Sequence, residues 1–231
     1  MNKTIYIADD EKNIRDLLQT FLEQEGFAVQ SFANGDALLN AFEAAEPDLV
    51  ILDVMMPGID GFVACANIRN KSDVPIILLT ARGSDADYIT GFTLGADDYF
   101  TKPFSPIKLT MRVKALFKRL DKEECMVDKK ELRFADIVIC PRQKTAFCNE
   151  KEIRFTNTEY AVLSYILQHQ EKAISREELL NEIWGYDQAV ETRVTDDIIK
   201  RVRKKLALAE SRASIETIWG FGFKLSENTE P

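Results

Sequence analysis

Short apolar runs alternate with amphipathic segments through the first half of the chain. Five runs have the length of strands and cover residues 3–8, 27–32, 49–53, 74–80 and 97–100. Between and after them, apolar positions recur at helical spacing over residues 11–25, 35–45, 60–71, 84–94 and 105–119. Two of the runs are apolar without alternation, as expected of central parallel strands covered on both faces. This order predicts an α/β doubly wound, five-stranded parallel sheet over residues 1–120.

The rest of the chain predicts a second domain of a different class. Residues 121–130 are charged and poor in apolar side chains, which indicates a linker. Short antiparallel strands, helical segments and a closing hairpin about a glycine-containing turn then follow. We expect strands at 132–139, 144–149 and 151–155, helices at 156–169, 175–184 and 191–207, and the hairpin at 214–226. These elements predict an α+β winged helix-turn-helix domain over residues 131–228.

Polar residues stand where the strands of the first predicted domain end. They are Asp9, Asp10, Asp53, Thr80 and Lys102. A single acid at a strand end is more often a turn or cap residue. The carboxyl ends of parallel strands, however, meet at one edge of the sheet, and doubly wound folds place their sites there. We therefore expect these five side chains to form one site.

The residue types in this set indicate phosphoryl transfer. Mg²⁺ prefers near-octahedral oxygen ligands and is held by one or two carboxylates together with phosphate oxygens. Asp10 and Asp53 can supply such ligands, and Asp9 can add charge through water. The Asp53 carboxylate can attack an activated phosphorus to give an aspartyl phosphate. Lys102 would then pair with the phosphoryl oxygens, and the Thr80 hydroxyl would donate to another.

Charge and composition narrow the possible partners and the possible location of the protein. The net charge of −8 argues against nucleic acid as a partner, yet residues 200–205 place five basic residues in six positions. The single histidine, His169, lies in a polar run, so the chain has no plausible phosphohistidine of its own. The four cysteines are widely spaced. Without a signal peptide or a membrane-length apolar stretch, we expect a cytoplasmic protein with no membrane partner.

Four segments of the first half resemble the receiver domain of two-component response regulators. They are DDE at 9–11, LVILDVMMPGIDG at 49–61, LLTAR at 78–82 and GADDYFTKPF at 95–104. The resemblance extends over residues 1–120 and implies a flavodoxin-like fold. It also implies that Asp53 is phosphorylated by a partner sensor histidine kinase, with Mg²⁺ as cofactor.

The same resemblance implies roles for individual residues. The metal ligands would be Asp9, Asp10, Asp53 and the Met55 carbonyl. Thr80 and Tyr99 would be the switch residues that repack the surface of the fourth helix, fifth strand and fifth helix after phosphorylation. A cis peptide bond is usual at the step that Lys102–Pro103 matches.

The resemblance further implies a homodimer on activation. Asp97, Asp98 and Arg112 match residues that pair across the dimer face. Tyr88 and Lys108 stand where the family pattern pairs a basic residue with a glutamate, so one inter-subunit pair is missing. Exposed pairs contribute only about 0–1 kcal/mol each, so we expect the dimer to persist with altered strength.

Four segments of the second half resemble the winged-helix effector domain of the OmpR/PhoB subfamily. They are FTNTEYAVLSYIL at 155–167, SREELLNEIWGYD at 175–187, TRVTDDIIKRVRKKL at 192–206 and IETIWGFGFKL at 215–225. Within the second segment, Ser175 and Glu178 have the spacing of a capping box. The resemblance implies binding to double-stranded promoter DNA and action on RNA polymerase.

The DNA contacts are expected on the recognition helix and the wing. Val194, Ile198, Val202 and Leu206 recur at helical spacing and would face the core. Basic residues of the same helix would contact phosphates and base edges, and Lys205 belongs to the same basic run. The expected contacts are Arg193, Thr195, Lys200, Arg201, Arg203, Lys204 and Trp219.

The chain departs from the family pattern in the recognition helix and in the wing. Asp197 and Ile198 occupy places where an apolar residue and a histidine are common. In the wing, Trp219 replaces an arginine that enters the minor groove, and an indole cannot imitate a guanidinium there. We therefore expect weaker or altered minor-groove reading, with affinity depending more on the recognition helix and on dimerisation.

Three functions fit the sequence. The leading one is a transcriptional regulator that phosphorylation of Asp53 activates. A phosphatase or phosphotransferase with an aspartyl intermediate needs a second acid two residues after the nucleophile, and Met55 stands there. A regulator that binds DNA without phosphorylation is the third, and the complete acid, threonine and lysine set argues against it.

Overall fold

A computed structural model describes residues 3–81, 95–124, 131–185 and 193–228. The helix expected at 84–94, and Tyr88 within it, lie outside the described residues. The chain divides into two compact units, Met1–Met111 and Arg112–Pro231. No helix of the described ranges combines the length and the apolar character needed to cross a membrane.

The first unit is built on a five-stranded parallel sheet in the order β2-β1-β3-β4-β5. The strands are β1 (Thr4–Ala8), β2 (Ala28–Phe32), β3 (Leu49–Asp53), β4 (Ile76–Ala81) and β5 (Asp98–Lys102). Every residue of β3 is buried, as its unbroken apolar run predicted. Parallel register places Ile7 beside Ile51 and Asp53 beside Leu79, so neighbouring strands end at one edge. The predicted sheet is confirmed.

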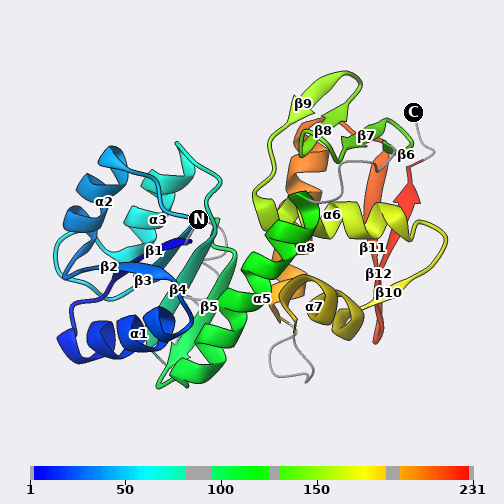
Figure 1. Cartoon of the computed structure of the whole chain (residues 1–231). Helices are drawn as coiled ribbons and strands as arrows, with labels where there is room; N and C mark the ends of the chain where they lie inside the picture. The colour runs from blue at the N-terminus through cyan, green and yellow to red at the C-terminus, as the bar shows by residue number, and fades with distance from the viewer. Residues whose placement is uncertain (1–2, 82–94, 125–130, 186–192, 229–231) are drawn as a thin grey trace. The chain divides into compact units, whose positions relative to one another are not determined.

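Helices cover both faces of this sheet (Figure 1). They are α1 (Lys12–Gln24), α2 (Gly35–Ala44), α3 (Gly61–Arg69) and α5 (Pro106–Glu124). The predicted linker at 121–130 needs a correction, because α5 continues to Glu124. The lysine and glutamate residues that indicated a linker are also good helix formers.

The second unit starts with the C-terminal part of α5 and contains a four-stranded antiparallel sheet, β6-β7-β8-β9. Its strands are β6 (Leu132–Phe134), β7 (Ile137–Cys140), β8 (Thr145–Cys148) and β9 (Lys151–Ile153). The sequence predicted a single strand at 132–139, and this was wrong. The chain turns at Ala135, which has a φ of 49°, and Asp136 fixes the turn by accepting hydrogen bonds from Ser211 Oγ at 2.7 Å and Arg212 N at 2.9 Å.

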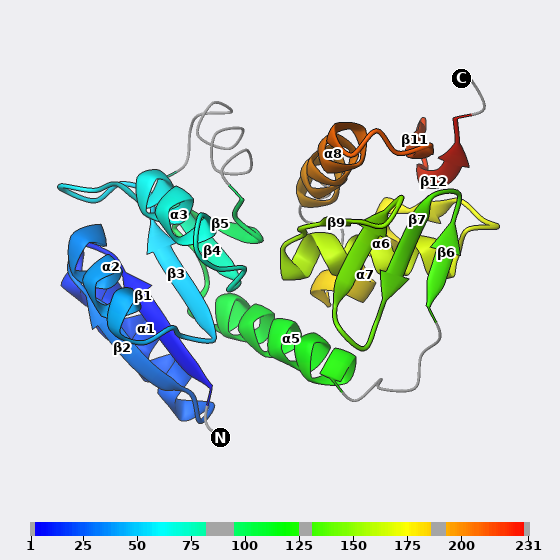
Figure 2. The same cartoon turned by 90° about the horizontal axis from the view of Figure 1, so that it is seen from above.

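Three helices and a second sheet complete this unit. The helices are α6 (Asn157–Gln168), α7 (Arg176–Trp184) and α8 (Arg193–Leu208), and the sheet, in the order β10-β12-β11, contains β10 (Ile174–Ser175), β11 (Ala213–Ile218) and β12 (Gly222–Glu227). Figure 2 shows α6 lying against the four-stranded sheet. The apolar face predicted for the recognition helix, α8, is confirmed, because Val194, Ile198, Val202 and Leu206 are all buried.

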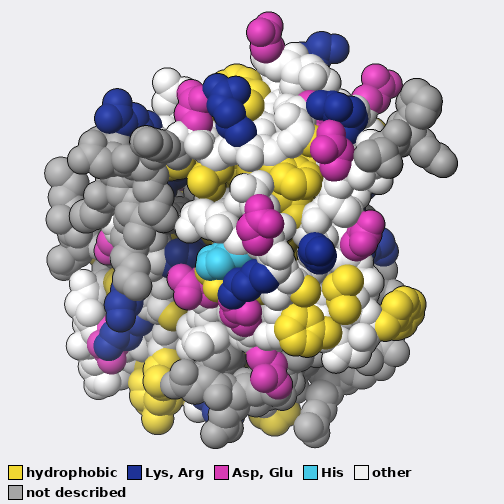
Figure 3. All heavy atoms as spheres, turned by 90° about the vertical axis from the view of Figure 1, so that its right-hand side faces the viewer, with side chains coloured by type: hydrophobic (Ala, Val, Ile, Leu, Met, Phe, Trp, Pro, Cys, Tyr) yellow, Lys and Arg dark blue, Asp and Glu magenta, His cyan; other side chains and the backbone are white. Residues whose placement is uncertain are grey.

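One face of the second unit carries interspersed acidic and basic side chains (Figure 3). The histidine lies among them, and its Nδ1 is 2.9 Å from the Tyr165 carbonyl oxygen. Because charges of both signs are mixed on this face, the net charge says little about the partner. The local basic run on α8 is the feature that indicates an anionic partner.

Candidate functional site

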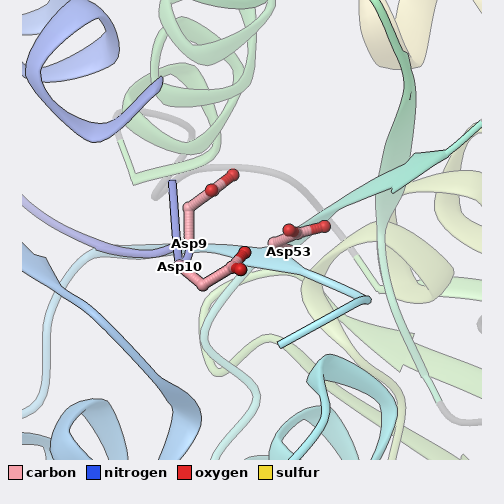
Figure 4. Close-up of side chains that lie close together, drawn as sticks. All are labelled: Asp9, Asp10 and Asp53. Carbon is pink, nitrogen blue, oxygen red and sulfur yellow. The ribbon is translucent and has the colours of Figure 1, made fainter. Parts of the chain in front are cut away.

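Three aspartates meet at the carboxyl edge of the parallel sheet. Asp9 and Asp10 follow β1, and Asp53 is the last residue of β3, the neighbouring strand (Figure 4). Carboxylate oxygens of the three lie within 4.8 Å of one another. Asp9 and Asp53 are buried, whereas Asp10 is exposed. Three hard oxygen donors, one of them open to solvent, form a donor set that fits Mg²⁺.

Lys102 contacts two of these acids from β5, the edge strand that lies next to β4. It ends β5, and its Nζ lies 2.8 Å from both Asp9 Oδ2 and Asp53 Oδ2. The Glu11 carboxylate is more distant, at 3.6 Å. The ammonium compensates part of the charge that the carboxylates concentrate here. The peptide bond Lys102–Pro103 is cis, as the family pattern implied.

Burial and pairing act in opposite directions on this cluster. Burial raises the pKa of Asp53, and the hydrogen bond and charge of Lys102 only partly offset that effect. Burial alone would lower the pKa of Lys102, but its hydrogen bonds to Asp53 and Asp9 and their negative charges outweigh burial and raise it. Lys102 thus stays a cation, and the pocket gains from any further positive charge.

Backbone groups hold the acids in place. Asp9 Oδ1 accepts from Glu11 N at 2.9 Å, and Asp53 Oδ1 accepts from Met55 N at 3.3 Å. Arg15 Nη1 donates to the carbonyl oxygens of Asp9 at 2.6 Å and Asp10 at 3.0 Å. No pattern in the sequence singled out Arg15 for this role.

Gly61 is a second residue that the sequence reasoning missed. A Cβ at this position would lie 2.1 Å from the Asp53 carbonyl oxygen, so only glycine permits the approach of α3. The sequence did carry a signal for this role, because Gly61 directly follows Asp60, the N-cap of α3.

Thr80 and Tyr99 occupy the strands next to this pocket. Thr80 pairs with Thr101, one residue before Lys102, and its Oγ1 donates to the Ala81 carbonyl at 3.2 Å. Tyr99 pairs with Leu78 inside the sheet. Both side chains are buried. The structure therefore brings Asp53, Thr80 and Lys102 to the ends of three adjacent strands.

The residues expected on the dimer face are buried. Asp97 Oδ2 accepts from Arg69 Nη2 at 2.5 Å and from Ile76 N at 3.0 Å. Asp98 and Arg112 are also buried. Arg69 at the end of α3 binds the Asp97 carboxylate within the same unit, and pairing of Asp97, Asp98 and Arg112 across a dimer stays a prediction.

The basic run of α8 divides into two groups. Lys200 and Lys204 are exposed. Arg201 Nε donates to Glu159 Oε1 at 2.7 Å, and Lys205 Nζ donates to Glu159 Oε2 at 2.5 Å. Burial alone would raise the pKa of Glu159, but the charges of Arg201 and Lys205 outweigh burial and lower it.

Three of the expected DNA contacts are engaged inside the protein. Arg203 donates from Nε to the Ile215 carbonyl at 2.6 Å and from Nη2 to Thr217 Oγ1 at 2.8 Å. Thr195 is fully buried. Arg201, bound to Glu159, and Arg203 thus hold α8 to its own unit, and the role of Thr195, Arg201 and Arg203 as DNA contacts stays a prediction. The side chain of Arg193 lies outside the described part of the chain.

Family models match both units. The model described as "Response regulator receiver domain" matches residues 5–114. The model described as "Transcriptional regulatory protein, C terminal" matches residues 150–225.

Similar proteins match along nearly the full length. The transcriptional regulatory protein ResD of Bacillus subtilis is 38% identical over 232 residues, covering 98% of this chain and 97% of ResD. The alkaline phosphatase synthesis transcriptional regulatory protein PhoP of the same organism is 38% identical over 235 residues, covering 98% of both chains. The structure of DrrB, an OmpR/PhoB homologue from Thermotoga maritima, is similar with a TM-score of 0.53 and 33% identity, over 98% of this chain and all of DrrB. The chain therefore belongs to the response regulators of the OmpR/PhoB type, which join a receiver domain to a DNA-binding transcriptional regulatory domain.

Proposed function

We propose that Asp53 is the phosphoryl acceptor through which this transcriptional regulator is controlled. The observation that carries the proposal is the position of Lys102 Nζ, 2.8 Å from Asp53 and from Asp9. A carboxylate oxygen of Asp53 attacks the phosphorus of a phosphohistidine on a partner kinase. The new O–P bond forms as the P–N bond breaks, and the histidine nitrogen leaves with the bonding electron pair. Lys102 stabilises the negative charge of the transferred group.

The residues around Asp53 fit Mg²⁺. Asp9, Asp10, Asp53 and the Met55 carbonyl would hold the ion, which, when bound, neutralises charge on the phosphoryl oxygens. The donor set supports this assignment, because three carboxylates face a single ammonium in the cluster. The same groups support hydrolysis of the aspartyl phosphate, so the receiver assists both its phosphorylation and its dephosphorylation.

Phosphorylation is proposed to act through Thr80 and Tyr99. A phosphoryl group adds acceptor oxygens near the end of β4, where the Thr80 hydroxyl donates to the Ala81 carbonyl at 3.2 Å. Rotation of Thr80 toward the phosphoryl group changes the space next to Tyr99. This repacking would promote a homodimer in the cytoplasm. The homodimer would place two α8 helices on promoter DNA and act on RNA polymerase.

A small phosphodonor tests the acceptor directly. Incubation with acetyl phosphate and Mg²⁺ is expected to add one phosphoryl group to the intact chain, as read by mass spectrometry. Asp53→Asn should abolish the adduct, and chelation of Mg²⁺ should suppress it. Catalytic release of phosphate from many donors, without a measurable adduct, would favour a phosphatase. If no adduct forms while promoter DNA is still bound, the chain is a regulator that works without phosphorylation.

A further inference from the structure

Arg15 of α1 binds the backbone of the turn that carries two of the three acids. Its Nη1 donates to the Asp9 carbonyl oxygen at 2.6 Å and to the Asp10 carbonyl oxygen at 3.0 Å. Consecutive carbonyls of an extended strand point in opposite directions, so a single nitrogen cannot reach both of them in a strand. The chain therefore curves directly after β1, and Arg15 holds both carbonyls on one side of the curve.

This curve determines where the two carboxylates point. Successive side chains of a strand lie on opposite faces, yet carboxylate oxygens of Asp9 and Asp10 both belong to the cluster of three acids. The Asp9 carboxylate is fixed by bonds of its own, since it accepts from Glu11 N and from Lys102 Nζ. The Asp10 carboxylate makes no hydrogen bond or ion pair within the part of the chain that the structure describes. Its direction therefore depends on the backbone that Arg15 holds.

Arg15 is itself anchored next to this turn. Ile14 N and Arg15 N donate to the Glu11 carbonyl oxygen at 3.1 and 3.2 Å, where α1 begins. Glu11 is the N-cap of α1 and makes no side-chain cap bond, so its side chain does not hold the start of the helix. The Arg15 side chain instead returns to the turn and ties α1 to the end of β1. Its replacement would release the turn without removing any side chain of the phosphoryl site.

The charge and the hydrogen bonds of Arg15 have opposite effects on cation binding. A guanidinium near three carboxylates repels a divalent cation, so loss of its charge alone would strengthen binding of the cation. Its hydrogen bonds orient a carboxylate that can bind metal, and loss of such outer contacts typically lowers metal affinity by about tenfold or more. The sign of the change in affinity therefore separates a residue that only compensates charge from one that positions a ligand.

We propose that Arg15 is a positioning residue for the Mg²⁺ site, which holds the turn after β1 so that the Asp10 carboxylate faces the ion. The inference rests on the proposed function and deepens it, because it assigns a determinant of metal affinity outside the ligand set. Loss of Arg15 should weaken Mg²⁺ binding and raise the Mg²⁺ concentration that phosphorylation of Asp53 requires. The rate at saturating Mg²⁺ should stay near that of the wild type, because Asp53 and Lys102 are unchanged.

Titration of the full-length protein with Mn²⁺ tests metal binding without any reaction. Mn²⁺ takes the same oxygen ligands as Mg²⁺, and electron paramagnetic resonance counts the free ion, while competition gives the affinity for Mg²⁺. Arg15→Met is expected to weaken binding of both ions about tenfold. Arg15→Lys keeps the charge but not the planar guanidinium, so its loss of affinity should be smaller. The Mg²⁺ concentration that gives half the maximal rate with acetyl phosphate should rise by the same factor in each variant.

The matched control is Lys12→Met, which removes another cation from the first turn of α1. Lys12 Nζ pairs with Asp16 Oδ2 at 2.6 Å, and both side chains are exposed. Its loss should change the affinity for either ion by less than about twofold, because exposed charges are well screened. Circular dichroism without metal shows whether each variant is folded. If Arg15→Met does not fold, the comparison of Arg15→Lys with Lys12→Met decides the question.

Four outcomes would overturn the inference. Unchanged or tighter Mn²⁺ binding by a folded Arg15 variant would make the guanidinium a charge compensator only, while the proposed function stands. An equal loss of affinity in Lys12→Met would show that any cation at the start of α1 is sufficient. A lower maximal rate with an unchanged Mg²⁺ requirement would place the effect of Arg15 on the transfer step. If the wild-type chain binds neither ion and forms no adduct on Asp53, the proposed function and the inference fail together.

Discussion

Arg201 Nε lies 2.7 Å from Glu159 Oε1, so an arginine of the recognition helix is bound to a buried carboxylate of α6. Lys205 binds the other oxygen of Glu159, and the Thr156 amide donates to the same oxygen at 2.9 Å. One acid therefore caps α6 and anchors α8. The orientation of the recognition helix therefore depends on the charge of Glu159, a residue that is not among the expected DNA contacts.

Glu159→Gln should destabilise the second unit strongly. The amide oxygen can still cap α6, but two partly buried cations lose their counter-charge, which typically costs about 3 kcal/mol. The free energy of unfolding in urea measures the effect. Glu152→Gln, at an exposed strand position, should change it little. A comparable loss in both variants would show that Glu159 has no special role.

The same acid predicts a pH dependence. Its folded pKa is lowered from the ordinary value of 4.5, so its stabilisation is complete above that pH and is lost as the pH falls through the folded value. Unfolding free energies from neutral to acid pH should therefore converge for the wild type and Glu159→Gln. Parallel curves at all pH values would contradict the assignment.

Gly61→Ala should disturb the phosphoryl site, although Gly61 contributes no side chain to that site. The new Cβ would be placed 2.1 Å from the Asp53 carbonyl oxygen, and the strand end must shift to accommodate it. A displacement of about 1 Å at a reacting group can slow a reaction about a hundredfold. The rate of phosphorylation by acetyl phosphate measures this. Val63→Ala, at an exposed position on the same helix, should react like wild type.

Lys102→Met should slow phosphorylation and increase the response to Mg²⁺. Loss of a preorganised cation at the transferring group costs about a hundredfold in rate. Without the ammonium, Asp9 and Asp53 repel each other, so Mg²⁺ should raise the unfolding temperature more than it does in wild type. Calorimetry with and without Mg²⁺ checks this, with Lys108→Met as the exposed-lysine control. An unchanged Mg²⁺ response would argue that the ion binds elsewhere.

Arg69 and Asp97 should behave as a structural pair. Arg69→Met leaves a buried carboxylate without its cation and should cost about 3 kcal/mol of unfolding free energy. Asp97→Asn, combined with Arg69→Met, should show a coupling energy above about 1 kcal/mol. If Asp97→Asn changes only dimerisation and leaves monomer stability intact, the pair is not structural.

Much of the fold could be predicted because its signals are local. The unbroken apolar run of β3 and the spacing of Val194 and Ile198 on α8 depend only on which faces are buried. The edge that gathers Asp9, Asp53 and Lys102 follows from parallel topology. The split of β6 from β7 was missed, because the turn at Asp136 is stabilised by Ser211 and Arg212, far away in sequence.

Residue roles were harder to predict than elements. The spacing of Ser175 and Glu178 suggested a reciprocal capping box, and Ser175 does cap α7, with its Oγ 3.0 Å from Glu178 N. The Glu178 carboxylate, however, binds Lys172 and Tyr165. A reciprocal box forms instead at Thr156 and Glu159. Sequence spacing shows which bonds are possible, and the choice among them depends on tertiary neighbours.

The Asp136 turn determines where the second unit can be separated from the rest of the chain. The family match there begins at residue 150, but Asp136 accepts hydrogen bonds from Ser211 and Arg212, just before β11. A fragment that starts at residue 150 would leave Ser211 and Arg212 without their acceptor, Asp136. It would also expose the side of α6 that the four-stranded sheet covers. A fragment that starts before Leu132 keeps the Asp136 contacts, so the four-stranded sheet is an integral part of the second unit and cannot be left out.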